Sequence, residues 1–159
     1  MIQDVFEESS TWAELPHKFE AGTPAIAEAI GLAEAINYIN TIGLNEIHEY
    51  EKNITQYLFK KLNQIEDIEI IGPSPENDPD RASLATFYIK NIHANDIAEI
   101  LDSKGICIRS GHHCCQPLHR YIGIKSTARI SMNFTTNKEE IDIFLEKLKE
   151  TINFLKMNS

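Results

Sequence analysis

The chain has few cysteines, and they lie close together. All three, Cys107, Cys114 and Cys115, fall within nine positions, which is too few and too clustered for the disulfide framework of a small secreted domain. Adjacent residues such as Cys114 and Cys115 also do not readily meet the geometry of a disulfide with each other. We therefore expect reduced thiols in a cytosol-like compartment.

The chain also lacks long apolar runs and an excess of basic residues. It has no run of 18 apolar residues and no leader with a basic start followed by an apolar stretch, so we expect neither a membrane span nor a secretory signal. Fifteen Lys and Arg face 24 Asp and Glu, for a net charge of −9. Nucleic acids and anionic membranes require a concentrated basic surface, so we expect neither as a partner.

What is present is typical of one globular domain with its own core: 159 residues, 42% hydrophobic and 25% charged. Apolar residues at three- and four-residue steps predict helices over 24–39, 44–65, 93–104 and 136–155. Short apolar or β-rich runs predict strands over 68–71, 83–89, 106–108 and 128–132. These elements predict an α+β fold in layers, with helices packed on a small, mostly antiparallel sheet.

Local signals refine this interpretation. Thr136 and Glu139 form a T-x-x-E pattern that predicts a capping box at the start of the last helix, and Gly105 is expected to cap the end of the helix over 93–104. Residues 72–81 hold three prolines and are expected to form a surface loop. Residues 1–24 show no sustained periodicity, and we expect an irregular segment whose apolar side chains need a partner surface.

The densest group of reactive side chains is the stretch from Arg109 to His119, R-S-G-H-H-C-C-Q-P-L-H. It follows an expected strand and contains Gly and Pro, which favours a loop, where functional residues concentrate. Cationic neighbours favour the thiolate, which is the nucleophilic form of a cysteine. Two alternatives stay open: buried cysteines beside solvated histidines, or a zinc site. Structural zinc sites separate their ligands and draw on a second cluster, and the sequence has none.

Two further features suit an anionic ligand. Thr23 stands just before Pro24 and the first expected helix, where backbone N–H groups and a hydroxyl suit a phosphate; an ordinary helix N-cap is the alternative. Arg129 lies on an expected strand, opposite in orientation to its apolar neighbours. Its guanidinium suits a carboxylate or a phosphate, and the alternative is a surface ion pair.

Taken in order, these features closely resemble the C-terminal portion of the Suf-type (group II) cysteine desulfurases, a group that includes selenocysteine lyases. These are pyridoxal-phosphate enzymes of the class-V aminotransferase type that mobilise sulfur for iron–sulfur cluster assembly. The matching segments are F-E-A-G-T-P at 19–24, I-G-L-A-E-A-I at 30–36, G-L-N-E-I at 43–47, R-S-G-H-H-C at 109–114, Q-P-L at 116–118 and A-R-I-S at 128–131.

The resemblance implies a role for each matching residue. Cys114 corresponds to the nucleophile that takes sulfur from L-cysteine, leaving L-alanine, and becomes a persulfide. Arg129 corresponds to the arginine that binds the substrate α-carboxylate, and Arg109 to an arginine near the active-site loop. Thr23 corresponds to a threonine that reaches the cofactor phosphate of a neighbouring subunit, which implies a homodimer.

The remaining residues of the motif receive weaker assignments. His112 and His113 belong to it as supporting residues, with no proton-transfer role assigned to either, and Cys115 has no fixed counterpart. No metal is implied. The other partners implied are L-cysteine or L-selenocysteine and a sulfur-acceptor protein, in the cytoplasm or in an organelle stroma such as that of a plastid.

The family's cofactor-binding lysine, in a Ser-x-His-Lys context, belongs to a large domain upstream of everything matched here. The His17-Lys18 pair follows Leu15-Pro16 instead and lies downstream of that position. We therefore expect residues 1–24 to connect to an absent large domain that binds pyridoxal phosphate, and residues 25–159 to form the small C-terminal domain of a fold-type I transferase. On this interpretation the isolated chain is inactive; a non-catalytic domain that binds a sulfur carrier, or a zinc module, is the alternative.

Overall fold

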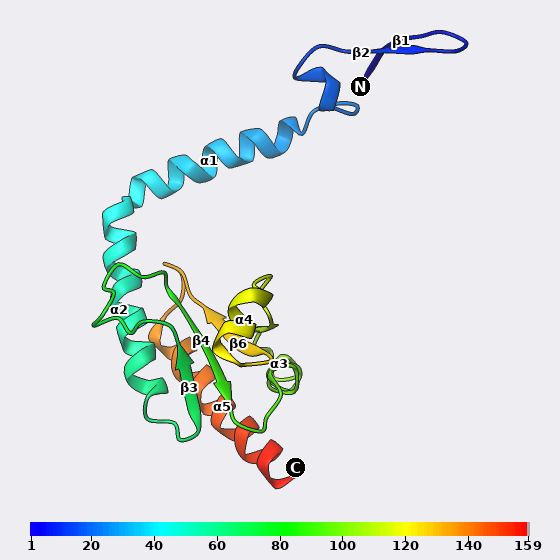
Figure 1. The fold of residues 1–159 in the computed structure, drawn as a ribbon. Coiled ribbons are helices and arrows are strands. Elements are labelled where there is room, and N and C mark those ends of the chain that lie inside the picture. The colour runs from blue at the N-terminus through cyan, green and yellow to red at the C-terminus, as the bar shows by residue number, and fades with distance from the viewer. Residues whose placement is uncertain (159) are drawn as a thin grey trace. The chain divides into compact units, whose positions relative to one another are not determined.

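A computed structural model describes residues 1–158 (Figure 1). The chain divides into two compact units, Met1–Leu44 and Asn45–Ser159, and each is described by itself. Whether the connecting segment ends at residue 24 stays a prediction. Among the described residues, no helix is both long and apolar enough to cross a membrane.

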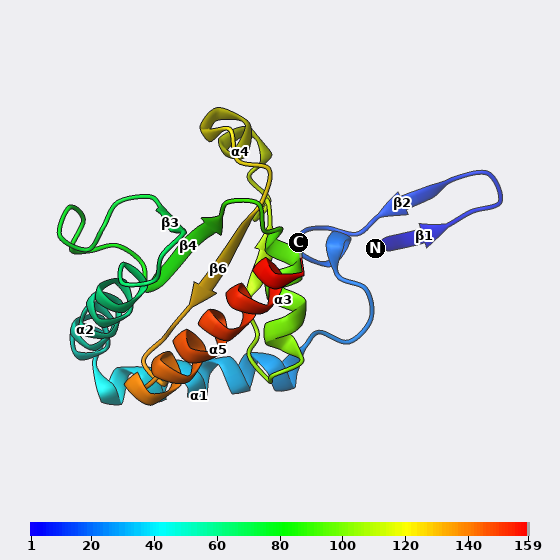
Figure 2. The same ribbon diagram turned by 90° about the horizontal axis from the view of Figure 1, so that it is seen from below.

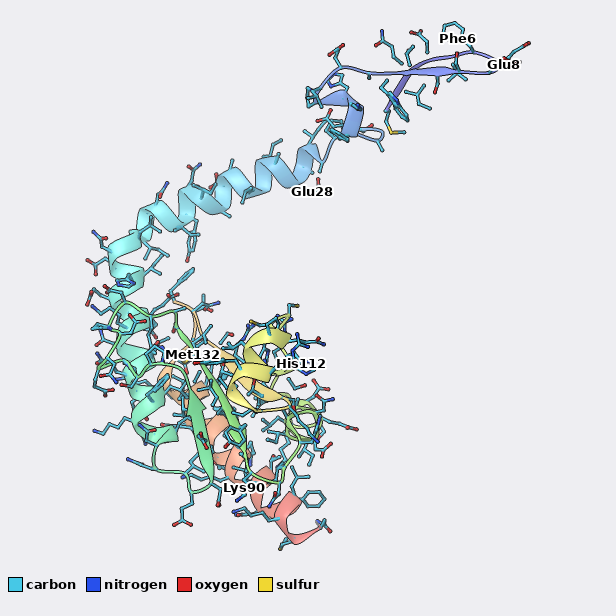
Figure 3. The ribbon with its side chains drawn as sticks, viewed as in Figure 1. Phe6, Glu8, Glu28, Lys90, His112 and Met132 are labelled. Atoms are coloured by element: carbon cyan, nitrogen blue, oxygen red, sulfur yellow. The ribbon has the colours of Figure 1, made fainter. Side chains whose placement is uncertain are left out.

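The first unit opens with a β-hairpin that the sequence analysis missed. Strand β1 (Ile2–Val5) pairs antiparallel with β2 (Ser10–Trp12), and the Phe6 amide donates to the Ser9 carbonyl across the turn (2.8 Å). Figure 3 labels Phe6 and Glu8 at the end of this hairpin. A short 3-10 helix, η1 (His17–Phe19), follows. The expectation of an irregular segment was therefore wrong, because strands of three and four residues are too short to establish an alternating pattern.

Helix α1 (Ile26–Ile42) completes the first unit and ends at Gly43, whose φ of +98° suits glycine. The helix predicted over 24–39 begins two residues before α1 begins and ends three residues before α1 ends. The N-cap is Ala25, which makes no side-chain cap bond, so Thr23 is not the cap that the alternative interpretation required. None of the α1 residues is buried, and the side chains of Ile30, Leu32 and Ile36 are exposed.

The second unit contains a four-stranded sheet of order β3-β4-β6-β5, in which every neighbouring pair is antiparallel. In chain order its elements are α2 (Leu44–Leu62), β3 (Ile68–Ile71), β4 (Leu84–Ile89), α3 (Ala94–Asp102), β5 (Arg109–Gly111), α4 (Gln116–Ile122), β6 (Thr127–Ser131) and α5 (Lys138–Met157). The α+β fold class with a small antiparallel sheet is thus confirmed.

One face of this sheet carries the core. Along β4, Ala85, Phe87 and Ile89 are buried while the residues between them are only half-buried, as alternation in a strand requires. The buried set packs with apolar stripes from α2, α3 and α5, which Figure 2 shows lying across the sheet. The opposite face carries Thr86 and Arg129 as cross-strand partners, and this is the face from which the site is built.

Three local predictions differ from the structure. The strand expected at 106–108 lies at Arg109–Gly111, because those are the residues that pair with β6. The loop expected to reach His119 instead becomes helix α4 at Gln116. The capping box of α5 is formed by Asn137 and Glu140, one residue later than predicted. The Thr136 hydroxyl instead accepts from the Asn133 amide (3.2 Å).

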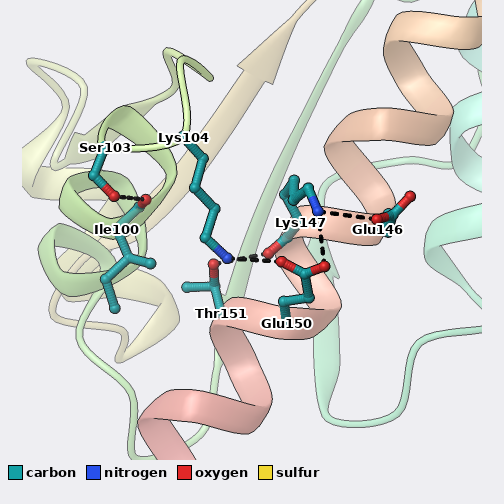
Figure 4. Close-up of polar contacts among 7 residues, drawn as sticks. All are labelled: Ile100, Ser103, Lys104, Glu146, Lys147, Glu150 and Thr151. Carbon is teal, nitrogen blue, oxygen red and sulfur yellow. Dashed lines mark hydrogen bonds and ion pairs between the residues drawn. The ribbon is translucent and has the colours of Figure 1, made fainter.

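The end of α3 is joined to α5 by charged side chains (Figure 4). Lys104 Nζ lies 2.9 Å from Glu150, which also pairs with Lys147 at 2.8 Å. These contacts hold the pKa of Glu150 down at about 2, with the hydrogen bond from Lys147 the largest cause and that from Lys104 next.

Helix α3 ends at Asp102, and its C-cap is Ser103. Gly105 (φ +76°) therefore lies beyond the C-cap position that was predicted for it.

Candidate functional site

The cysteine-bearing loop leaves the edge strand β5 and enters α4 through a tight turn. The Cys115 amide donates to the His112 carbonyl at 2.8 Å. His113 and Cys114 have φ values of +51° and +59°, a left-handed conformation that non-glycine residues rarely adopt and that is enriched at functional sites. The turn holds two consecutive residues in this conformation and leaves Cys114 exposed.

Arg109, the first residue of β5, reaches across this turn to Cys114. Its Nη2 atom donates to Cys114 Sγ at 3.3 Å, so a permanent positive charge lies against the sulfur. All three cysteines are free and exposed, and the alternative in which they are small buried residues is therefore wrong. The contact suits a nucleophilic thiolate, because a guanidinium stabilises the negative charge that such a sulfur carries.

A second arginine stands beside the first. Arg109 and Arg129 are direct partners in the β5–β6 ladder, so their side chains leave the same face of the sheet. Like charges placed opposite each other are unfavourable unless an anion lies between them. Among residues 1–158, neither guanidinium has a carboxylate partner, and Arg129 Nε is buried without a hydrogen bond. Within the described chain Arg129 is therefore not in a surface ion pair, and its charge remains available to an external anion.

Behind the loop lies a network of two histidines and a threonine that the sequence did not predict. The Thr127 hydroxyl lies 2.9 Å from His113 Nε2 and 3.1 Å from His119 Nε2, and His119 Nδ1 lies 3.1 Å from the Cys115 carbonyl. Thr127 is fully buried and His119 is 5% exposed. No sequence signal marks these contacts, because they join residues 8 and 14 positions apart.

The charge of His113 is set by these surroundings. Burial lowers the pKa of its imidazole, and the neighbouring positive charges of Arg129 and Arg109 lower the pKa further, followed by His119. These surroundings therefore favour the neutral form of the His113 ring. Its Nδ1 atom is buried and has no hydrogen-bond partner within the described chain. His112, by contrast, is exposed (Figure 3) and places its ring edge-on to His119, at 5.3 Å between ring centroids.

A pocket of about 260 Å³ opens on this face of the sheet, next to the loop. Its walls are mainly apolar with a few polar groups, an arrangement typical of small-molecule sites. The lining residues are Ile71, Gly72, Leu84, Thr86, His113, Cys115, Leu118, His119, Ile122, Thr127 and Arg129. Thr127 and Arg129 of β6 thus line the same cavity as His113 and Cys115 of the loop.

Thr23, the expected phosphate-binding residue, belongs to the first unit and is exposed there. Its neighbour Gly22 has a φ of +78°, and no atom lies within 4 Å of where a side-chain β-carbon would stand. The backbone at this point is therefore open to a ligand. In the part of the chain that the structure describes, no group of three or more His, Cys, Asp or Glu side chains could hold a metal ion.

Comparison with known proteins gives a consistent result. The aminotransferase class-V family profile matches residues 1–144. A probable cysteine desulfurase from Synechocystis sp. is 51% identical over 154 residues, 97% of this chain and 36% of that protein. One from Staphylococcus epidermidis is 47% identical over 154 residues, with 97% of this chain and 37% of the relative covered.

Among solved structures, the apo cysteine desulfurase of Thermococcus onnurineus NA1 matches with a TM-score of 0.77 and 37% identity, over 96% of this chain and 37% of that one. The chain therefore spans little more than a third of the length of the relatives it matches. The similarity to these proteins extends over 96–97% of the present sequence.

Proposed function

The chain belongs to the aminotransferase class-V family, and on that premise we propose that it supplies the sulfur-accepting part of a cysteine desulfurase. Such an enzyme takes sulfur from L-cysteine, leaves L-alanine and holds the sulfur as a persulfide. The single observation that carries the proposal is the contact between Arg109 Nη2 and the exposed Cys114 Sγ at 3.3 Å. It lies one strand away from Arg129, a guanidinium without an acidic partner in the described chain.

In this proposal Cys114 is the nucleophile. Its thiolate attacks the sulfur of the substrate, a sulfur–sulfur bond forms, and the electron pair of the broken carbon–sulfur bond stays with the substrate carbon. The exposed position of Cys114 supports this role, since the persulfide must afterwards reach an acceptor thiolate. Arg109 stabilises the negative charge on the sulfur both before and after the transfer.

Arg129, with Arg109 beside it, binds the substrate α-carboxylate. The two guanidiniums leave the same face of the sheet, and a carboxylate between them would relieve their mutual repulsion. An arginine fork also matches the planar geometry of a carboxylate. The half-buried setting of Arg129 strengthens this interaction, since water screens it less there than at the surface.

Pyridoxal phosphate, when bound, supplies the electron sink that stabilises the carbanion left on the substrate. Of the residues described here, Thr23 suits the phosphate group of the cofactor, because it is exposed beside an open glycine backbone. Its contact with a partner subunit's cofactor, in a homodimer, is part of the proposal. The chain's own residues otherwise bind the carboxylate and accept the sulfur.

The finer aspects of function are proposed on the same basis. The persulfide on Cys114 passes to a sulfur-acceptor protein for iron–sulfur cluster assembly in the cytoplasm or in an organelle stroma. L-Selenocysteine is the alternative substrate, because a selenium atom attached to the same carbon presents the same carboxylate and offers a similar site of attack.

The test uses an enzyme that is as long as the relatives and contains this sequence. It compares the two adjacent thiols, Cys114 and Cys115. Cys114→Ser is expected to abolish the persulfide formed from L-cysteine, while Cys115→Ser is expected to retain it, because only Cys114 receives the Arg109 contact. Mass spectrometry of alkylated peptides locates the extra sulfur, and alanine release measures turnover. A persulfide found on Cys115, or full turnover by Cys114→Ser, would contradict the assignment.

A further inference from the structure

The hydrogen bonds behind the loop determine where the protons lie on two rings. The Cys115 carbonyl can only accept, so His119 Nδ1, at 3.1 Å, carries a hydrogen. When the His119 ring carries a single hydrogen, on Nδ1, its Nε2 has a lone pair and accepts from the Thr127 hydroxyl at 3.1 Å. Both ring nitrogens of His119 are then engaged, and so is the single hydrogen of Thr127.

Only one placement of the hydrogen on the His113 ring then remains. The Thr127 oxygen has already used its hydrogen and can only accept, so His113 Nε2, at 2.9 Å, is the donor. In a neutral imidazole only one nitrogen carries a hydrogen. The buried Nδ1 atom of His113, which has no partner in the described chain, therefore carries an unused lone pair.

The charged and titratable groups around His113 are consistent with a neutral ring. Arg129 approaches it from β6 and Arg109 from β5, and both guanidiniums oppose a positive charge on its imidazole, while the His119 ring faces it from α4. The sulfurs of Cys114 and Cys115 lie on its own loop. No carboxylate in the described part of the chain acts on it.

We propose that Thr127 and His119 are positioning residues that hold His113 in the Nε2–H tautomer, so that its Nδ1 presents a fixed hydrogen-bond acceptor beside the cysteine loop. His113 and Arg129 line the same pocket. The role of the acceptor rests on the proposed function, whereas the tautomer itself does not.

The competing arrangement is well defined. If His119 were protonated, it would donate to Thr127 through Nε2, and the Thr127 hydrogen would turn toward His113 Nε2. The hydrogen of His113 would then stand on Nδ1, and the site would present a donor in place of an acceptor. The competing arrangement carries one additional proton, on His119, and needs no movement of the heavier atoms, so the experiment must observe the ring nitrogens directly.

Long-range ¹H–¹⁵N correlation spectra of the ¹⁵N-labelled chain at neutral pH make this observation, with His113→Gln used to assign the ring. We expect a pyridine-type shift for His113 Nδ1 and a pyrrole-type shift for Nε2. For His119 we expect the reverse, with the pyrrole-type nitrogen at Nδ1. A protonated His113, or one with its hydrogen on Nδ1, would overturn the proposal in the unaltered protein, before any variant is made.

Three variants then test the role of the hydroxyl. Thr127→Val removes it at nearly constant volume, and we expect His113 to lose its single tautomer and show an averaged pattern. Thr127→Ser restores the hydroxyl and should restore the pattern. Thr151→Val is the matched control, because Thr151 is also fully buried but its hydroxyl donates only to the Lys147 carbonyl of its own helix. It should leave all histidine signals unchanged.

The outcomes separate this proposal from the desulfurase function. The spectra need neither cofactor, substrate nor turnover, so an enzyme that failed to release alanine would leave the tautomer result intact. Conversely, an unchanged single tautomer in Thr127→Val would overturn the positioning role while leaving Cys114 as the sulfur acceptor. If Thr127→Val fails to fold, His119→Phe provides the second test: it removes the acceptor of the Thr127 hydrogen, and the single tautomer of His113 should again be lost.

Discussion

The two units of the chain use their apolar residues in opposite ways. In the second unit, helices α2, α3 and α5 bury their apolar stripes against β4 and β6. In the first unit, α1 buries no residue, although Glu28 and Glu34 are its only charged side chains. A helix that is apolar on all sides is normally buried in a larger protein. The comparison teaches that apolar content alone does not make a core; the apolar residues must also face a surface that can cover them.

The largest expected effect separates the two units with the same substitution. Leu58→Ala in α2 removes a fully buried side chain and should lower the free energy of unfolding by about 2–5 kcal/mol. Leu32→Ala in α1 removes a side chain that is 62% exposed, and the change should stay within about 0.5 kcal/mol. Urea unfolding followed by far-ultraviolet circular dichroism measures both. Equal losses would show that the units do not differ as described.

A smaller effect is expected at the helix starts. Asn137→Ala removes the side chain that accepts from the Glu140 amide at 2.8 Å, and should cost about 1 kcal/mol. Thr23→Ala, near the start of α1, should cost nothing measurable, because the N-cap of α1 is Ala25 and makes no side-chain bond. The same unfolding measurement serves for both. A loss of stability in Thr23→Ala would show that Thr23 caps α1, contrary to the structure.

The smallest effect concerns acid stability and belongs to the second unit. The folded-state pKa of Glu150 is lowered from 4.5 to about 2. The contribution of Glu150 to the free energy of unfolding is therefore present above pH 4.5 and is lost as the pH falls from 4.5 toward 2. NMR titration of its carboxylate measures this pKa directly. Lys147→Gln should raise the pKa more than Lys104→Gln, and added salt should raise it as well, because the pair is exposed and screened. An ordinary pKa in the unaltered chain would contradict the network.

The secondary structure of the second unit was largely predictable where a pattern extends over several turns. The apolar stripe of α5, including Ile141, Phe144 and Leu148, lies in the core as its spacing predicted. Strands β3, β4 and β6 lie within a residue of their predicted bounds. The elements that were not predicted are the two strands of the first hairpin, β5 and α4. Each is short and rich in polar residues, so no apolar pattern marks it.

The candidate site was also predictable only in part. The residue types in the loop from Arg109 to His119, and their family resemblance, were evident from the letters alone. The contact of Arg109 with Cys114 and the hydrogen bonds that join His113 to His119 through Thr127 were not. A local pattern reports which side chains occur near one another in sequence, but it does not report which atoms meet.

The sequence by itself determined the fold class, the long helices and the identity of the cysteine loop, because each depends on residues a few positions apart. Only the tertiary structure decided that Arg109 stands opposite Arg129 and that His113 Nδ1 is buried without a hydrogen-bond partner in the described chain. The physical reason is the register of β5 against β6. Pairing these strands places the loop over Thr127, and a shift of one residue would turn the side chains of β5 to the other face of the sheet.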